Sequence, residues 1–443
     1  MEGARSGVVR SLRGSKNAPA FATAITLFAL SCSSAGRPSA PNSSALDSAA
    51  PDSAASASAP PGEAGTDDAG TDDAGADDAG TDDAGRDSPA DEGFAMAPHT
   101  AYPNISSEGG VTLASVQVVS VSFQGDRNTP DLVGFLDWMV QSNWLSRVAG
   151  EYGVLGITQH VHVDLPGPAP AALADGDVRA LLAAKIADGT IPGARPPASP
   201  LLYVMFFPNG SSVAGLTDGD ACTDIPGNGY HNATNSTPPG PPYIVMPACD
   251  PRFSAILSQI QGMELETARL LVDVFTDPNP AGSPAYRLTD DSNPWTAIGP
   301  ELGDFCWGRL TKDGSYTLQR VFSNQAAASG ADPCVPAPAG SVAFGMTTSP
   351  AGLQTLQVGV PFAFTVTGWS AQAVPDWSFQ ATPWVGDYAV EATVDKSTLN
   401  NGQTATLQVT VPYTVPLGTY GTVRLEALTG SDSPSWPVAF VVR

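Results

Sequence analysis

The apolar residues between about residue 100 and residue 334 follow two different periods. Segments 111–123 and 157–163 alternate between apolar and polar positions and are rich in β-branched residues, which predicts strands. Segment 201–207 is apolar throughout and ends at a proline, as expected of a strand buried on both faces. A further short strand is predicted at 243–246.

Apolar residues at helical spacing separate these strands. Segment 129–144 starts with a threonine suited to an N-cap and a proline at the first helical position. Segment 175–186 starts with an aspartate that can cap a helix. A last helix is predicted at 264–275, before a Thr-Asp-Pro stop. This order predicts a three-layer α/β domain with a parallel or mixed sheet over residues 94–334.

The pattern changes again after residue 334. Segment 335–340 is rich in proline, alanine and glycine, which is typical of a linker. From 341 to 443, alternating segments separated by turn signals predict an all-β, immunoglobulin-like sandwich. Three of its tryptophans are candidates for a carbohydrate- or peptide-binding face: Trp369, Trp377 and Trp384. Together with Trp436 they can instead fill the core, which we expect of at least two of the four.

Residues 1–31 have the pattern of a signal peptide, with a basic leader followed by an uncharged apolar run at 18–30. The run is shorter than the roughly 20 residues that a membrane-spanning helix requires, so a permanent transmembrane anchor is not expected. Residues 28–33 (FALSCS) resemble the lipobox of bacterial lipoproteins, although Ala29 and Leu30 depart from its usual residues. The resemblance implies acylation of Cys32 and an anchor in the cell envelope, at the outer membrane. Ordinary secretion is the alternative.

Residues 32–93 predict a disordered acidic tether, because alanine, serine, proline, glycine and aspartate dominate and the segment contains no aromatic residue. A Gly-Thr/Ala-Asp-Asp-Ala unit occurs four times from Gly65 to Ala84. The repeat lacks an apolar position that would stack neighbouring turns, so a spacer is favoured over a calcium site. The tether carries much of the net charge of −24, which argues against nucleic acid or anionic lipid as a partner.

Four cysteines remain once Cys32 is assigned to lipid, and an even number in an exported chain predicts disulfides. Three pairings are possible. We favour Cys222 with Cys249 and Cys306 with Cys334, because each pair closes a local, turn-rich loop.

Several motifs follow one another in a fixed order between residues 229 and 306. They are Gly229-Tyr230-His231, a strand leading to Cys249, a helix ending at Thr276-Asp277-Pro278, Trp295, and Glu301-Leu302-Gly303-Asp304-Phe305-Cys306. The set resembles a family of secreted bacterial metallopeptidase-like proteins, distantly similar to plant exordium, or phosphate-induced, proteins. That resemblance covers about residues 111–306. In the family the helix reads Ser-His-Glu-x-x-Glu-Ala-x-Thr-Asp-Pro, which implies zinc-bound hydrolysis.

The helix of this chain lacks the groups on which that chemistry depends. Alignment on the Thr-Asp-Pro stop places Arg269 at the family's histidine, Leu270 at its first glutamate and Asp273 at its second. An arginine has no lone pair to donate to a metal, and a leucine cannot activate water. The acids that remain from the implied site are Asp273, Asp277, Glu301 and Asp304.

We interpret the domain as an inactivated descendant in which Arg269 replaces the positive charge of the metal, near Asp273 and near Glu301 or Asp304. In the alternative, Arg269 is a solvated helix residue. No cofactor is expected. Zinc held by relocated ligands, His160, His162 and His231, is the second possibility. His160 and His162 share one face of a strand and are expected to face solvent, and His231 is expected to pack beside the Gly229-Tyr230 turn.

Two classes of function follow. The first is an envelope lipoprotein that binds an envelope or extracellular protein or carbohydrate. The second is an active metal-dependent hydrolase with relocated ligands. The sequence contains no serine-hydrolase elbow, phosphate loop or dinucleotide fingerprint.

Overall fold

The computed structural model describes residues 94–443 except 194–199, 215–220, 223–228, 236–238, 250–255, 386–389 and 430–432. The predicted signal peptide, Cys32 and the acidic tether lie outside the described residues. The described residues belong to one compact unit. Within them, no helix has the length and apolar character needed to span a membrane. The fold of this part is mostly β, with several sheets and few helices.

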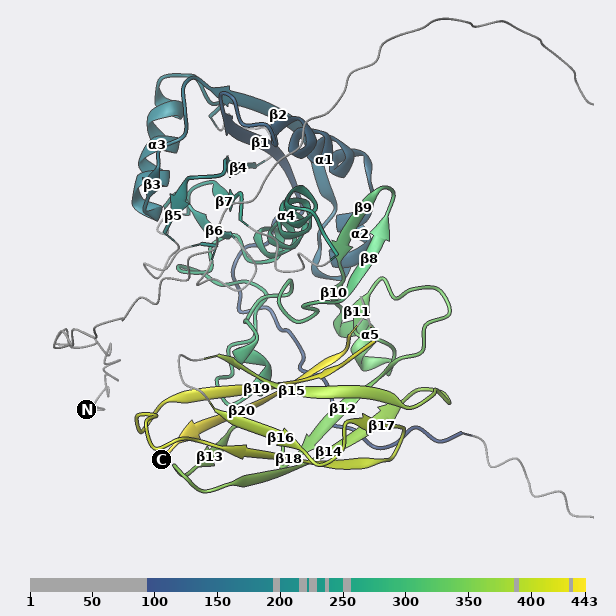
Figure 1. Ribbon diagram of the computed structural model, residues 1–443. Helices are drawn as coiled ribbons and strands as arrows, with labels where there is room; N and C mark the ends of the chain where they lie inside the picture. The colour runs from purple at the N-terminus through teal and green to yellow at the C-terminus, as the bar shows by residue number, and fades with distance from the viewer. Residues whose placement is uncertain are drawn as a thin grey trace, which may run out of the picture. The chain divides into compact units, whose positions relative to one another are not determined.

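A five-stranded sheet with the order β2-β1-β4-β7-β6 occupies the N-terminal part (Figure 1). Its strands are β1 (Ser115–Phe123), β2 (Gly156–Leu165), β4 (Leu201–Phe207), β6 (Tyr230–Ala233) and β7 (Pro242–Pro247). Neighbouring strands are parallel except at β6, which is antiparallel to β7. β4 is buried along its whole length, as its continuous apolar run predicts.

Helices cover both faces of this sheet. They are α1 (Thr129–Gln141), α2 (Trp144–Ala149), α3 (Asp175–Ala187) and α4 (Gln259–Thr276). α1, α2 and α4 share a core with Val116 and Val118 of β1, whereas α3 packs on the opposite face with Val119 and Val121. The alternation of β1 therefore serves two cores, one on each side.

Two helices differ from their predicted bounds. The segment predicted as one helix over 129–144 is divided, because α1 ends at Gln141 and α2 begins at Trp144. α4 begins five residues before its predicted start at 264, because Ser258 and Gln261 form a capping box.

The C-terminal part contains two further sheets, with orders β12-β14-β18-β16 and β13-β20-β19-β15-β17. Their strands are β12 (Phe344–Ser349), β13 (Gln354–Leu356), β14 (Phe362–Ser370), β15 (Trp377–Val385), β16 (Glu391–Val394), β17 (Thr398–Leu399), β18 (Thr404–Thr410), β19 (Tyr420–Ala427) and β20 (Ser435–Val442). All pairs are antiparallel except β13 with β20. Side chains from both sheets, such as Phe364 and Phe379, belong to one hydrophobic core.

Short elements complete the fold. They are β3 (Ala172–Leu173), β5 (Ser212–Val213), β8 (Leu310–Asp313), β9 (Tyr316–Gln319), β10 (Val321–Phe322), α5 (Asn324–Ala328), β11 (Cys334–Val335) and two 3-10 turns, η1 (Gly150–Tyr152) and η2 (Pro294–Ala297). β8 pairs with β9, β10 pairs with β11, and β3 pairs with β5.

The segment 94–105, which the sequence pattern assigns to the first domain, contacts both parts. The backbone N–H of Ala97 donates to Asn401 Oδ1 at 2.8 Å, and that of Thr100 donates to Thr347 Oγ1 at 3.2 Å. Farther along, the N–H of Ile105 donates to Asn324 Oδ1 at 2.9 Å. The segment is therefore tied to the C-terminal sheets before it reaches α5.

Two disulfides confirm the favoured pairing, Cys222 with Cys249 and Cys306 with Cys334. They close loops with sequence separations of 27 and 28 residues. Disulfides of this kind form in oxidising compartments, so the chain is an extracellular or envelope protein.

Candidate functional site

The candidate site is built on the polar side of α4. One side of this helix, with Ala268, Leu271 and Phe275, belongs to the core beneath the sheet. The polar side chains of Glu266, Arg269 and Asp273 follow one another at helical spacing, so they share a face, and they are buried as well. A second segment, the turn 301–306, lies against this polar face.

Arg269 is enclosed by carboxylates. Its Nε donates to Glu266 Oε2 at 2.8 Å, and its Nη1 donates to Asp273 Oδ2 at 2.9 Å. The same Nη1 lies 3.2 Å from Asp304 Oδ1. The residue is only 4% exposed, so the alternative that Arg269 is a solvated helix residue is wrong. Burial opposes the charged guanidinium, but Glu266, Asp273 and Asp304 outweigh burial and hold the pKa of Arg269 above its ordinary value.

The turn 301–306 is fixed to α4 through a glycine. The N–H of Gly303 donates to Asp273 Oδ1 at 2.7 Å, and Gln319 Nε2 donates to the Gly303 carbonyl. A Cβ at residue 303 would lie 2.6 Å from Asp273 Oδ1 and 2.7 Å from Arg269 Cγ. Only glycine therefore fits at this close approach.

His231 joins the same cluster from β6. Its Nε2 lies 3.1 Å from Glu301 Oε2, and both side chains are largely buried. The expectation that His231 merely packs beside the Gly229-Tyr230 turn is thus incomplete, because the turn delivers the imidazole to Glu301. Burial lowers the pKa of His231, but the carboxylates of Glu301, Asp273 and Asp277 together outweigh burial and raise it above its ordinary value. Burial raises the pKa of Glu301, but His231, Arg287 and Arg269 together lower it below its ordinary value.

The remaining acids of the cluster have raised pKa values. Burial raises the pKa of Asp304 to about 6 and that of Asp277 to about 6. Burial and the neighbouring Glu301 also raise the pKa of Asp273 well above its ordinary range. Asp277 accepts a hydrogen bond from the N–H of Ala285 at 2.9 Å. Carboxylates thus outnumber the cations that neutralise them at this site.

The donor set around Arg269 does not match a metal centre. Within the part of the chain that the structure describes, no three His, Cys, Asp or Glu side chains are grouped to hold a metal ion. The guanidinium itself lies among Glu266, Asp273 and Asp304, and it carries no lone pair. Leu270, at the position of the implied catalytic glutamate, is buried, and a Cβ placed on Gly229 would lie 3.3 Å from Leu270 Cδ1.

The other two candidate histidines lie at the opposite edge of the sheet. One row of residues crosses the sheet beneath α4: His162, Ser120, Val204, Ile244 and His231. Four strand spacings of about 4.8 Å separate His162 from His231, or roughly 19 Å. The three histidines proposed as relocated ligands therefore cannot share one ion.

His160 and His162 also have other partners. Ser120 Oγ lies 2.7 Å from His160 Nε2 and 2.9 Å from His162 Nδ1, and His160 Nδ1 lies 2.8 Å from Asp137 Oδ1. The His160 side chain is 2% exposed, so the expectation of a solvent-facing pair is wrong for this residue. α1 covers this face of β2, a tertiary placement that period-two alternation does not reveal.

Comparison with known proteins finds similarity only to solved structures. No protein-family model matches the sequence, and no curated protein is significantly similar to it. Domains 4 and 5 of the S-layer protein SbsC align at 12% identity over 23% of this chain and 53% of that chain, with a TM-score of 0.18. The titin M3 domain aligns at 15% identity over 23% of this chain and 96% of that domain, with a TM-score of 0.16. This chain thus spans about half the length of the S-layer fragment, and likenesses at these TM-scores carry no functional argument.

The tryptophans do not form the predicted binding face. Trp369 and Trp377 are 1% and 5% exposed, and both are core residues, as is Trp436. The side chain of Trp384 falls outside the described part of the chain. Core filling is therefore confirmed for three of the four.

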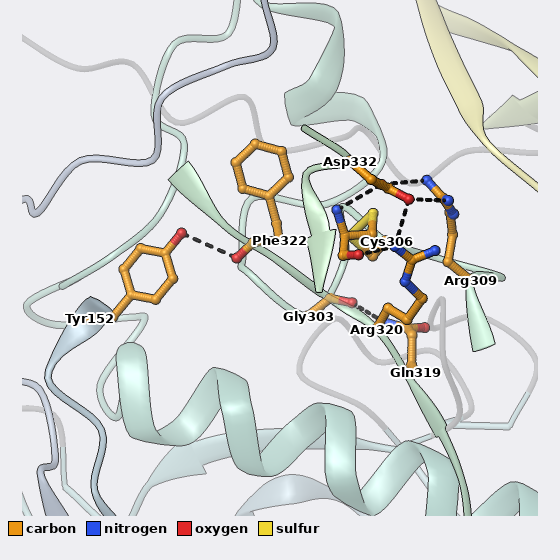
Figure 2. Close-up of a disulfide and its surroundings, with 9 residues drawn as sticks. Tyr152, Gly303, Cys306, Arg309, Gln319, Arg320, Phe322 and Asp332 are labelled. Carbon is orange, nitrogen blue, oxygen red and sulfur yellow. Dashed lines mark hydrogen bonds and ion pairs between the residues drawn. A yellow bond between two sulfur atoms is a disulfide. The ribbon is translucent and has the colours of Figure 1, made fainter. Parts of the chain in front are cut away.

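One buried ion cluster was not foreseen from the sequence. The Asp332 carboxylate accepts hydrogen bonds from Arg309 Nη2 at 2.7 Å and from Arg320 Nη2 at 2.6 Å, beside the Cys306–Cys334 disulfide (Figure 2). The N–H of Cys334 donates to the same carboxylate at 3.1 Å. This cluster holds the disulfide loop, whose Cys306 ends the turn that carries Glu301 and Asp304. These partners are 12 to 23 residues apart, and no spacing rule connects them.

Proposed function

We propose that this chain is a lipid-anchored envelope protein with a degenerate, inactive metallopeptidase-like domain. In this proposal residues 94–334 form a three-layer α/β module of that type. Residues 341–443 form an immunoglobulin-like sandwich, and the two act together in binding an envelope or extracellular protein or carbohydrate. The two disulfides support export. Acylation at Cys32 and placement at the outer membrane rest on the leader and its lipobox-like sequence.

The observation that carries the proposal is the guanidinium of Arg269 among Glu266, Asp273 and Asp304. In a zinc peptidase, two functions depend on the helix: a histidine donates a lone pair to the ion, and a glutamate takes a proton from the bound water. In this chain, arginine and leucine stand at the two corresponding positions. The arginine supplies one positive charge to acids that would otherwise be buried together, so the fold is kept without the ion.

Zinc content of the mature chain tests this proposal. We expect no stoichiometric zinc in the wild type after equilibration with micromolar zinc, and no chelator-sensitive proteolysis. The double variant Arg269→His with Leu270→Glu restores the pattern beside Asp273 and should gain about one zinc per molecule. Elemental analysis measures both.

A triple variant provides the matched control. Adding Asp273→Asn removes one restored ligand and should lower the zinc content again, which distinguishes the site from adventitious binding. About one zinc per wild-type molecule, with proteolysis that a chelator abolishes, would contradict the proposal and favour the active hydrolase. If the double variant does not fold, because Leu270→Glu buries a carboxylate, the wild-type measurement decides alone.

A further inference from the structure

A chain of hydrogen bonds joins α1, β2 and β1 at the edge of the five-stranded sheet. It runs from Asp137 through His160 to Ser120, with distances of 2.8 and 2.7 Å. It continues from Ser120 Oγ to His162 Nδ1 at 2.9 Å. Ser122 Oγ extends it, at 3.3 Å from His162 Nε2 and 3.1 Å from Asp164 Oδ1.

The first three members have the connectivity of a catalytic triad but the opposite exposure. In a serine hydrolase the hydroxyl faces the substrate, and the carboxylate is buried behind the imidazole. Here Ser120 is 0% exposed and the Asp137 side chain is 57% exposed. Solvent therefore reaches the chain at its acidic end and not at its hydroxyl, so the arrangement is suited to sensing protons and not to nucleophilic attack.

Ser120 limits how many protons the chain can hold. Its hydroxyl has one hydrogen, so it can donate to one of the two histidines and accept from the other. With one of the imidazoles protonated, five hydrogens serve the five contacts from Asp137 to Asp164, and every hydrogen bond can be satisfied. With both neutral, only four hydrogens are present, and one contact lacks its hydrogen. With both protonated, two N–H groups point at the same oxygen, and the hydroxyl hydrogen has no acceptor on either ring.

The surroundings of His162 oppose that second proton. The charged or titratable groups that face it are His160 and Asp164 on β2 and Asp137 on α1. Burial and the neighbouring His160 together lower the pKa of His162, and the two aspartates only partly oppose this. Because the folded state prefers the neutral ring, the stability that this ring contributes is complete above the unfolded pKa of about 6.5. It is lost as the pH falls below that value and through the lower pKa of the folded state.

We propose that this chain of groups is an acid-sensitive clasp that holds β2 and α1 on the sheet and opens when both His160 and His162 are protonated. β2 is an edge strand whose neighbour in the sheet is β1 alone. Ser120 and Asp137 supply the contacts that its two histidines make to β1 and α1. Opening would free the edge of β2 that now pairs with β1, and that edge can then pair with another strand. The clasp is independent of the Arg269 cluster, which lies across the sheet.

The test follows the histidine signals and the amide protection of the mature chain by NMR, in chelator, from pH 8 to pH 5. We expect His162 to titrate below the ordinary value of about 6.5. As His162 becomes protonated, the amide protection factors in β2 should fall. The fall should be about tenfold for each unit by which folding depresses the pKa of His162, and the protection factors in β4 should stay constant. Unchanged β2 protection through the titration of His162 would overturn the clasp.

Single-histidine variants sharpen this experiment. His162→Gln and His160→Gln each leave one imidazole at Ser120, so both variants should lose the acid-induced fall in β2 protection. His99→Gln, whose ring stacks on Trp369 with centroids 4.2 Å apart, should retain it. Retention of the fall in either His160→Gln or His162→Gln would also overturn the clasp. If one of them does not fold, the other provides the same comparison.

Discussion

At the scale of single residues, Arg269 connects acids from two segments of the chain. Its guanidinium bonds to Glu266 and Asp273 within α4 and to Asp304 in the turn 301–306. Removing one partner from a buried ion cluster leaves the others desolvated and uncompensated, which costs more than the cluster itself contributes. Arg269 is thus a stabilising residue at the position where the family resemblance implies a metal ligand.

Replacing Arg269 with alanine should therefore be severe. We expect Arg269→Ala to lower the free energy of unfolding by about 3–5 kcal/mol. Urea denaturation of the mature chain measures this change. Lys185→Ala is the matched control, because it breaks an exposed i,i+3 pair with Asp188, and it should leave the free energy of unfolding almost unchanged. Equal, small effects from both substitutions would show that the buried cluster contributes little.

Sequence reasoning anticipated the local part of this site and missed the rest. The contact of Arg269 with Asp273 follows from helical spacing alone, and the acids of the turn entered through the ordered motifs. The second cluster, which links Ser120 to His160 and Asp137, was not anticipated. It depends on the register of β1 with β2 and on the placement of α1. Such contacts are set by tertiary packing, which periodicity does not encode.

At the scale of elements, regular patterns located the segments but not their ends. α3 starts within one residue of its predicted start, but Asp175, the expected N-cap, is its first helical residue. The N-cap is Ala174, whose backbone N–H donates to Asp177 Oδ2 at 2.9 Å. α4 was placed too late, because its apolar period begins after the capping box at Ser258. The extra turn brings the N-terminus of α4 to the loop beside β4, where Gln259 Nε2 and Asn209 Oδ1 lie 2.9 Å apart.

The two disulfides should differ in what they stabilise. By the chain-entropy relation each loop contributes about 3 kcal/mol. The Cys306–Cys334 bond also positions the turn that carries Glu301 and Asp304, so the pair Cys306→Ser and Cys334→Ser should lower the melting temperature more than Cys222→Ser with Cys249→Ser. Calorimetry of both double variants under non-reducing conditions tests this order, and an equal loss would leave loop entropy as the whole effect.

At the scale of the whole molecule, the predicted linker at 335–340 is not the only connection between the parts in the described residues. Residues 94–105 form a second, through hydrogen bonds to Thr347, Asn401 and Asn324. Composition revealed the linker, because residues 335–340 are rich in proline, alanine and glycine. The second has no such signature, and it became evident only from backbone contacts.

Attachment of the whole chain is predicted to depend on Cys32. Because the apolar leader is too short to remain as a membrane helix, Cys32→Ser should move the protein from the membrane fraction to the soluble fraction. Fractionation with immunoblotting measures the shift, and mass analysis of the wild-type N-terminus should detect the acyl group. Unchanged membrane association of the variant, together with an unmodified wild-type N-terminus, would contradict lipid anchoring.

The path of the segment 94–105 has a mechanical consequence. Tension arriving from the N-terminal side meets the bonds of Ala97 and Thr100 to the C-terminal sheets first, and only then the bond of Ile105 to Asn324. The load therefore enters the molecule at the C-terminal sheets, although the segment precedes the five-stranded sheet in sequence. These bonds must break before a pull applied at residue 94 reaches the Arg269 cluster or the edge strand β2.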